Sequence, residues 1–515
     1  MLVKTYGAAV QGIDALTVTI EVNVQNGFNF CIVGLPDTSV KESYQRVVSA
    51  LKQCGYNFPH RSVVVNMAPA DIKKEGAAYD LPIAVGILVG SEQIQSECLD
   101  CYMIMGELSL DGSVHPIRGV LPMAIEARRK GFKGMIVPAA NATEAAVVNN
   151  LDVYGVENLT EVIDFLRGVS FPEKVEFDTR AEFAKAQAVL DLDFSEVKGQ
   201  ENVKRAFEVA CAGGHNILLV GAPGSGKSMM SKRLPGIMPP LSLSEALETT
   251  KIHSVAGRLK KGAKLMTQRP FRSPHHTISP VALVGGGSNP LPGEISLAHN
   301  GILFMDEFPE FPRQVLEVLR QPLEDRTISI SRAKYAVDYP AGFMLVASMN
   351  PCPCGYYNHP SKPCTCMPGA VNKYLGKISG PLLDRIDIQC EILPVPFEKL
   401  SGMADGEPSA AIRERVVRAR EIQARRYADE KGIFCNAQMN TRLMKQYCAL
   451  DDECQKILKH AMTKYDMSAR AYDRILKVAR TIADLAGSEA IRPDHVREAI
   501  SYRNLDRSSW GSTLG

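Results

Sequence analysis

A glycine-rich segment that follows a short apolar run constrains the fold of this 515-residue chain more than any other feature. The apolar run is Ile217–Val220, and it leads directly into residues 221–228, with the sequence GAPGSGKS. This matches the pattern G-x-x-x-x-G-K-[ST] in the strand–loop–helix setting that gives the pattern meaning. Glycines let backbone N–H groups turn toward phosphates, and the following helix directs its positive end at them. The segment therefore predicts a P-loop that binds a nucleotide.

The residue types of this P-loop predict individual contacts with ATP and Mg²⁺. Lys227 should reach the β- and γ-phosphates, and the hydroxyl of Ser228 should ligate Mg²⁺. The rest of the loop should surround the phosphates with Gly221, Ala222, Pro223, Gly224, Ser225 and Gly226. The alternative is a glycine-rich turn that merely connects two elements, and the preceding strand argues against it.

Two further apolar runs end in polar residues that suit the same site. Gly301–Met305 runs into Asp306 and Glu307, and Phe343–Met349 runs into Asn350. Asp306 should hold Mg²⁺ at the carboxyl end of its strand, and Glu307 should polarise the attacking water. The amide of Asn350 should orient water or the γ-phosphate. An Asn-Pro turn that simply ends a strand is the alternative for Asn350.

A cluster of four cysteines directly follows Asn350. Cys352, Cys354, Cys364 and Cys366 form two C-x-C pairs in a chain whose thirteen cysteines carry no secreted signature. Such thiols should be reduced, and four thiolates on two short hairpins can surround one tetrahedral Zn²⁺. Free thiols and an iron–sulfur cluster are the alternatives. His359 could replace one ligand, but a solvated loop histidine is the simpler interpretation.

The order of strand and helix signals predicts an α/β protein of about three domains. Between residues 191 and 395 the order strand, helix, strand repeats, which indicates a parallel sheet with right-handed crossovers. Earlier in the chain, strands are expected at Thr17–Val24 and Ser62–Asn66, and helices at Thr38–Cys54 and Leu121–Lys130. Beyond Pro396 the pattern is helical, at Ala410–Asp429, Asp452–Lys464, Arg470–Ala486 and Pro493–Tyr502.

The composition of the chain indicates where in the cell the protein resides more clearly than what the protein does. A formal net charge of +2 neither indicates nor excludes a nucleic-acid partner. Apolar runs such as Leu81–Gly90 are about half the ~20 residues that a membrane helix needs. The N-terminus has no apolar segment or cleavage site typical of a secretory signal. We therefore expect a cytoplasmic protein that does not bind membranes.

Many separate segments, in order over nearly the whole chain, resemble the AAA+ ATPases of the magnesium-chelatase-like group, and within it the YifB/ComM family. Besides the P-loop, Asp306-Glu307 and Asn350, they are Val33–Asp37, Arg272–Ile278, Pro292–His299, Leu382–Asp387, Ser468–Arg470 and Arg474–Leu485. The resemblance implies a parallel-sheet P-loop domain, a small helical lid, ATP hydrolysis with Mg²⁺, and assembly into a homo-hexameric ring.

The same resemblance implies roles for residues outside the P-loop. Arg385 matches the arginine that reaches into a neighbouring subunit's ATP site, where a permanently charged guanidinium can fork across phosphate oxygens. Arg470 matches the sensor arginine that the lid places over the γ-phosphate, and Arg474 is the competing candidate. Val197–Gln200 resembles the segment that packs against adenine. For each arginine, a surface ion pair is the alternative.

The N-terminal part resembles the proteolytic domain of Lon, through residues 105–119 and 128–138. Ala78 and Leu121 stand where Lon has its serine nucleophile and lysine base, so the domain should lack proteolytic activity. The predicted domains are a Lon-like α+β domain over 1–170, a linker over 171–190, an AAA+ core with a cysteine loop (352–366) over 191–395, and the helical lid over 396–515.

Two basic stretches raise the question of a DNA partner. Lys251–Gly287 interrupts the ATPase core with basic residues that include Lys260, Lys261 and Arg272, and such insertions can line a pore. The helix Arg413–Arg426 also carries arginines, although these do not share one face. The leading hypothesis is a ring motor acting on single-stranded or branched DNA. The alternatives are an ATP-dependent remodeller of protein complexes and a binding protein that uses ATP to switch assembly state.

Overall fold

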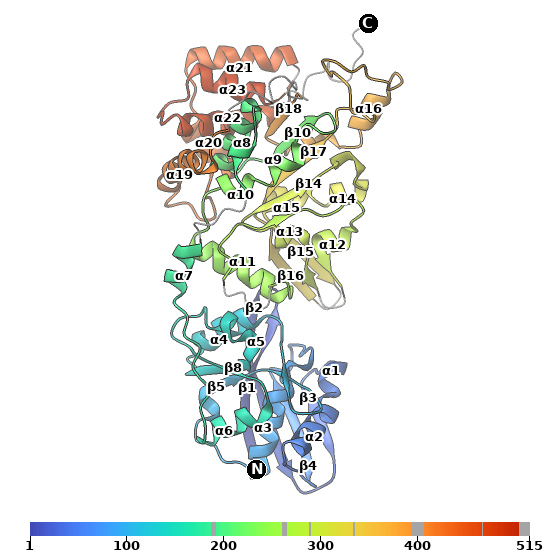
Figure 1. Ribbon diagram of the computed structural model, residues 1–515, viewed down its shortest axis with the longest axis vertical. Helices are drawn as coiled ribbons and strands as arrows, with labels where there is room; N and C mark the ends of the chain where they lie inside the picture. The colour runs from blue at the N-terminus through green and yellow to red at the C-terminus, as the bar shows by residue number, and fades with distance from the viewer. Residues whose placement is uncertain are drawn as a thin grey trace. The chain divides into compact units, whose positions relative to one another are not determined.

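The computed structural model describes residues 1–186, 192–259, 265–287, 290–332, 335–393, 406–465 and 467–503. The chain forms two compact units (Figure 1). Unit 1 comprises Met1–Gln187, Ser242–Thr267 and Pro290–Pro292, and unit 2 comprises the rest. Helix α7 (Thr179–Ala186) lies within the predicted linker. The domain boundaries given above stay predictions.

A seven-stranded mixed sheet forms the core of unit 1, in the order β3-β4-β2-β1-β5-β8-β9. Strand β2 is antiparallel to both β1 and β4, and the other neighbours are parallel. The predicted strands at 17–24 and 62–66 are confirmed within β2 and β4. The strands are β1 (Leu2–Gln11), β2 (Asp14–Gln25), β3 (Phe30–Val33), β4 (Ser62–Ala68), β5 (Tyr102–Ile104), β8 (Gly134–Pro138) and β9 (Asp152–Val156).

The helices of unit 1 cover this sheet. Helix α3 (Asp80–Gly90) is buried along its whole length against β1 and β2, because almost every position in it is apolar. The predicted helix at 121–130 is confirmed as α4 (Val120–Arg129), and the predicted helix at 38–54 is divided at Glu42. The remaining helices are α1 (Thr38–Lys41), α2 (Ser43–Gln53), α5 (Ala139–Ala145) and α6 (Leu159–Leu166).

One helix of unit 1 comes from the middle of the chain. Helix α11 (Leu243–Val255) begins with a capping box between Ser242 and Glu245 and packs against α4. Near its end, Ser254 Oγ donates to the buried Glu144 carboxylate at 2.5 Å, and the Ser254 carbonyl accepts from Gly119 N at 3.3 Å. The first half of the predicted basic insertion is therefore an integral part of unit 1.

A five-stranded parallel sheet forms the centre of unit 2, in the order β11-β14-β17-β10-β18. The strands are β11 (Phe271–Arg272), β14 (Ile302–Met305), β17 (Met344–Met349), β10 (Ile217–Gly221) and β18 (Ile388–Ile392). The predicted parallel sheet is confirmed. Strands β14, β17 and β10 lie side by side in this sheet. Their carboxyl ends therefore bring Asp306-Glu307, Asn350 and the P-loop to the same edge of the sheet. A separate hairpin joins β15 (Thr327–Arg332) to β16 (Tyr335–Pro340).

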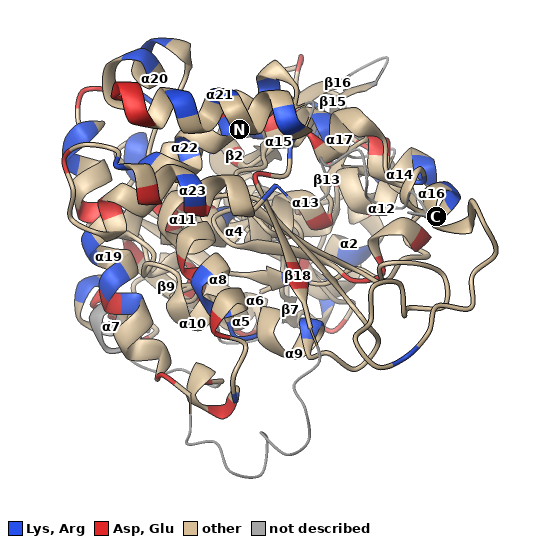
Figure 2. Ribbon diagram, turned by 90° about the horizontal axis from the view of Figure 1, so that it is seen from above, with Lys and Arg blue, Asp and Glu red and all other residues tan. Residues whose placement is uncertain are grey.

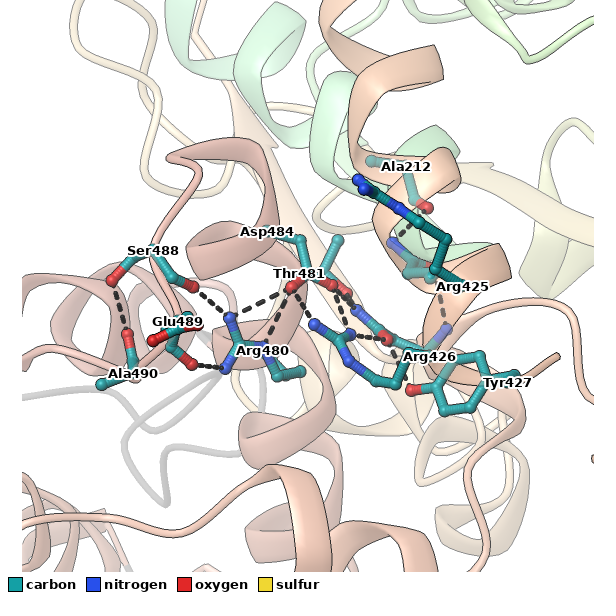
Figure 3. A network of polar contacts seen from close by, with 12 residues as sticks. Ala212, Arg425, Arg426, Tyr427, Arg480, Thr481, Asp484, Ser488, Glu489 and Ala490 are labelled. Carbon is teal, nitrogen blue, oxygen red and sulfur yellow. Dashed lines mark hydrogen bonds and ion pairs between the residues drawn. The ribbon is translucent and has the colours of Figure 1, made fainter. Parts of the chain in front are cut away.

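The C-terminal helices gather beside α8 (Glu201–Gly213) (Figure 1). They are α19 (Ser409–Arg426), α20 (Thr441–Tyr447), α21 (Asp452–Tyr465), α22 (Ala469–Leu485) and α23 (Pro493–Ser501), which confirms the predicted helical end of the chain. A buried ionic network stabilises this group: Asp484 on α22 accepts from Arg426 at 2.6 and 2.7 Å and from Arg480 at 3.0 Å (Figure 3). Arg480 also donates to the carbonyls of Ser488 and Glu489, so both guanidinium groups are satisfied.

Candidate nucleotide and metal sites

The P-loop joins β10 to helix α9 (Lys227–Ser231). Gly224 and Gly226 have φ values of +77° and +88°, a backbone conformation that favours glycine. These two residues turn the loop at the edge of the sheet, as the sequence pattern requires. Ser225 Oγ is buried and, among the described residues, has no hydrogen-bond partner. A buried hydroxyl of this kind fits a loop that surrounds phosphate oxygens.

Lys227 connects the P-loop to the end of β17. Its Nζ donates to the carbonyls of Gly221 at 2.7 Å and Ala222 at 3.0 Å, and to Asn350 Oδ1 at 3.2 Å. Burial lowers the pKa of Lys227, and the nearby Asp306 carboxylate opposes this shift. The structure therefore brings Lys227 and Asn350 together, as the strand ends predicted.

Asp306 lies within reach of both neighbouring strand ends. Its Oδ2 accepts from Ser228 Oγ at 2.6 Å, and its Oδ1 accepts from Ser348 Oγ. A hydroxyl and a carboxylate side by side are suitable ligands for Mg²⁺, which prefers oxygen and binds proteins through a few ligands plus water and phosphate. Ser228 and Asp306 thus fit a magnesium ion, and Ser348 fixes the orientation of the carboxylate.

Glu307 directly follows Asp306 and has an exposed side chain, 57% accessible. Its backbone has φ +54°, the left-handed region, which turns the side chain out of the strand direction. His276 Nδ1 lies 3.2 Å from Glu307 Oε2, and the His276 ring lies against His275. The sequence alone indicates no role for His276. The segment Arg272–Ile278 contains two adjacent histidines, but their sequence does not show which acidic residue either of them contacts.

Arg385 lies on the segment that follows α17 (Gly380–Leu383), and Arg470, in the first turn of α22, contacts the same segment. Arg385 is 8% exposed; it donates to Pro381 O at 2.7 Å and to Glu324 Oε2 at 2.5 Å, while its Nε is buried without a partner among the described residues. The Arg385 guanidinium holds the pKa of Glu324 below its ordinary value. Arg470 NH1 contacts Asp384, the residue next to Arg385, at 3.5 Å.

Arg474 forms an ion pair with the buried Asp387. Its NH1 lies 3.0 Å from Asp387 Oδ1, and His215 Nδ1 lies 3.1 Å from the other carboxylate oxygen. Burial alone would raise the pKa of Asp387, but Arg474 and His215 outweigh it and hold that pKa far below its ordinary range. Arg474 therefore serves this buried cluster, which leaves Arg470, 64% exposed, as the better sensor candidate.

The four predicted metal ligands come together. The Sγ atom of Cys352 lies 3.3 Å from that of Cys354 and 3.7 Å from that of Cys364, and all four sulfur atoms lie within 4.8 Å of one another. Zinc bound tetrahedrally at ~2.3 Å places its sulfur ligands about 3.8 Å apart, so the cluster fits this ion. Burial opposes ionisation of Cys354, but backbone N–H groups of Tyr356 and Thr365 lower its pKa to about 5. His359 Nδ1 instead accepts backbone N–H groups within the loop, from Ser361 and Lys362.

Several residues of the two basic stretches are paired. Arg272 forms a bidentate ion pair with Glu294, at 2.6 and 2.7 Å, and Lys251 contacts Asp14 at 2.5 Å. Figure 2 shows basic and acidic residues interspersed along α19 and its neighbouring helices. On α19, Arg415 pairs with Glu208 and Glu407, and Arg426 pairs with Asp484. Lys260, Lys261 and Lys264 lie outside the described residues.

Comparison with known proteins decides the family. Family models described as magnesium chelatase, subunit ChlI, match residues 20–141 and 193–400, and a model of the ChlI C-terminal part matches 406–503. The chain is 44% identical to the YifB protein of Salmonella typhimurium, over 97% of this chain and 96% of the relative. It is 43% identical to competence protein ComM of Haemophilus influenzae, over 98% of both. The chain belongs to the YifB/ComM family of magnesium-chelatase-like AAA+ proteins.

Shorter matches connect this YifB/ComM-family chain to two proteins of Bacillus subtilis. It is 28% identical to Lon protease 2 over 24% of the chain, and 32% identical to DNA repair protein RadA over 22%. The Lon match agrees with the predicted Lon-like fold at the N-terminus. At the positions of the Lon catalytic pair, Leu121 is buried, and Ala78 packs partly buried against the core of unit 1.

Within the described part of this YifB/ComM-family chain, every helix is too short or too polar to span a bilayer.

Proposed function

We propose that this chain is an AAA+ ATPase that works as an ATP-driven ring motor on DNA. Two hydrogen bonds at the edge of the sheet support ATP hydrolysis: Lys227 contacts Asn350, and Ser228 contacts Asp306. These four side chains come from three adjacent strand ends, where a nucleotide phosphate chain would lie. When bound, Mg²⁺ neutralises charge on the phosphates, and Ser228 and Asp306 would hold it.

The residues of the site divide the work of hydrolysis. Lys227 would exchange its carbonyl contacts for the β- and γ-phosphates, while Asn350 orients the γ-phosphate or the attacking water. Glu307 would accept a proton from that water as it attacks. Because Glu307 is exposed and contacts His276, it must turn from this partner toward the water.

A homo-hexameric ring would complete the site. Arg385 contacts Glu324 and Pro381, and Arg470 contacts Asp384, so both arginines gather at one loop of the subunit. We place this loop against the nucleotide of the neighbouring subunit, where both guanidinium groups stabilise charge on the γ-phosphate. Arg470 would then serve the neighbouring site together with Arg385.

DNA is the proposed substrate of the motor. Support comes from relatives: one is a competence protein, and the partial match RadA is a DNA repair protein. ATP hydrolysis should rise when DNA is added, most of all with single-stranded DNA or a four-way junction. DNA affinity should fall as the salt concentration rises. A plot of the logarithm of the binding constant against the logarithm of the salt concentration should have a slope of about −0.7 to −0.9 for each phosphate neutralised. ATPase assays without DNA, with single strands, with duplex and with junction test this, and an unchanged rate in all four would favour a remodeller of protein complexes.

Zinc is the proposed metal of the cysteine cluster. The purified protein should contain about one zinc per chain, and Cys366→Ser or Cys352→Ser should lower this content, because three thiolates hold the ion less tightly. Cys448→Ser is a matched control, since this buried cysteine lies in the helical end of the chain, away from the cluster. Metal analysis by mass spectrometry decides: absence of zinc, or an iron chromophore, would reject the assignment.

A further inference from the structure

The cysteine loop, residues 351–366, lies against the P-loop as well as following Asn350. Gly355 of this loop is buried and has φ +86°. A Cβ atom at Gly355 would lie 2.5 Å from Cδ and 2.8 Å from Cγ of Pro223, closer than such atoms approach in proteins. The backbone of the cysteine loop therefore contacts the proline ring of the P-loop directly, and this approach requires glycine.

The same loop is connected to the γ-phosphate end of the site through the chain itself. Asn350, which contacts Lys227, is separated from Cys352 by a single proline. Cys352 is completely buried, so the first metal ligand is fixed within the protein rather than at its surface. A displacement of the metal cluster would thus reach both Asn350 and Pro223.

A shared cleft extends this contact toward the end of β18. Its lining includes Gly221 and Ala222 of the P-loop, Tyr357 and His359 of the cysteine loop, Glu391 near the end of β18, and Leu393 directly after that strand. Glu391 and Leu393 also line the neighbouring cleft beside Gln200, whose side chain donates to Leu393 O at 2.7 Å. Gln200 belongs to Val197–Gln200, the segment that resembles the one packing against adenine in related ATPases. The cysteine loop therefore flanks the nucleotide site from the phosphate end toward the base.

We propose that the metal-bound cysteine loop is a structural wall of the nucleotide site, so that metal occupancy sets the affinity for nucleotide. The inference rests on the proposed function, because it requires a metal at the four cysteines and a nucleotide at the P-loop. Residues 351–369 contain no helix or strand, and all of them belong to the described part of the chain. A long irregular segment keeps one conformation when a metal closes it, since closure removes alternative conformations.

A wall of this kind acts by preorganisation. The P-loop has glycines at two positive φ values and can adopt other conformations when nothing holds it. Contact between Gly355 and Pro223 limits these conformations before the nucleotide arrives, and a site ordered in advance binds its ligand more tightly. Loss of the metal would release the loop and, with it, one side of the P-loop.

Two alanine variants test the contact. Gly355→Ala places a methyl group against Pro223, whereas Gly369→Ala, at φ +81°, places it where no atom lies within 4 Å. Both positions have a similar positive φ, +86° and +81°, so the main difference between the two variants is the clash with Pro223. We expect Gly355→Ala to weaken binding of a fluorescent Mg²⁺-ADP probe roughly tenfold or more with its zinc content unchanged. Gly369→Ala should bind like the unaltered chain.

Metal removal gives the second arm of the experiment. A zinc-selective chelator should weaken Mg²⁺-ADP binding of the unaltered chain to a similar degree, and Gly355→Ala should add little to that loss, because both changes act through one contact. Equal binding by the two alanine variants, or equally tight binding with and without metal, would overturn the proposal. The chelator measurement uses the unaltered chain. It therefore tests whether metal occupancy affects Mg²⁺-ADP binding even if Gly355→Ala does not fold. Failure of the ATPase proposal looks different, since then the untreated chain would bind no Mg²⁺-ADP.

Discussion

Arg385→Ala is expected to reduce the ATP turnover rate by roughly a thousandfold or more, the effect typical of an arginine that stabilises phosphoryl-transfer charge. The side chain is nearly buried, and its Nε has no partner in the part of the chain that the structure describes, which suits a group that gains its final partner from a bound phosphate. Nucleotide affinity of the isolated subunit should change little, because Arg385 would act on the neighbouring site. Turnover and Mg²⁺-ADP affinity, measured on one preparation, check both parts.

Arg418→Ala provides a matched control for the loss of an arginine. Arg418 is 65% exposed and pairs with Glu414 on the same helix, so its removal should leave turnover near that of the unaltered chain. If Arg385→Ala hydrolysed ATP as fast as Arg418→Ala, then Arg385 would be an ordinary ion-pair partner of Glu324.

Glu307→Gln should still bind ATP while hydrolysing it roughly a hundredfold or more slowly, because an amide cannot accept the proton of the attacking water. Lys227, Ser228 and Asp306 remain in place to hold the nucleotide and Mg²⁺. Lys227→Ala should instead weaken ATP binding by roughly tenfold or more, since it removes a charged donor to the phosphates. Equilibrium binding and single-turnover hydrolysis separate the two effects.

Glu310→Gln is a suitable control for the Glu307 substitution. Glu310 lies three positions along the same segment and pairs with Lys377 at the surface. Its replacement should leave both binding and hydrolysis intact. Equal loss of ATP binding in Glu307→Gln and Lys227→Ala would contradict the division of roles between these two residues.

The centre of the site could be predicted from the sequence because each part is local. A strand followed by glycines, or by Asp306 and Glu307, specifies a side chain at the carboxyl end of that strand. Adjacent parallel strands then bring those ends together, as the contact between Lys227 and Asn350 illustrates. The cysteine cluster was predictable for the same reason, since two C-x-C pairs on one loop need only a turn to meet.

Contacts between distant segments could not be predicted. Ser348 and His276 approach Asp306 and Glu307 from other parts of the chain, and neither has a periodic signal that identifies its partner. The arginines of α19 suggested a basic surface, but Glu208, Glu407 and Asp484 lie opposite them. Helix α11 follows the P-loop in sequence yet packs in unit 1, because its partners are Glu144 and α4.

A mixing experiment tests most directly whether ATP is hydrolysed between two subunits of a ring. Arg385→Ala subunits retain an intact P-loop, and Lys227→Ala subunits retain an intact arginine, so each mixed interface can unite the two functional halves. We expect two nearly inactive preparations to recover ATPase activity when mixed, with a maximum at intermediate ratios. Mixed rings, verified by mass, that stay inactive at every ratio would contradict it, because Arg385 would then serve the P-loop of its own subunit.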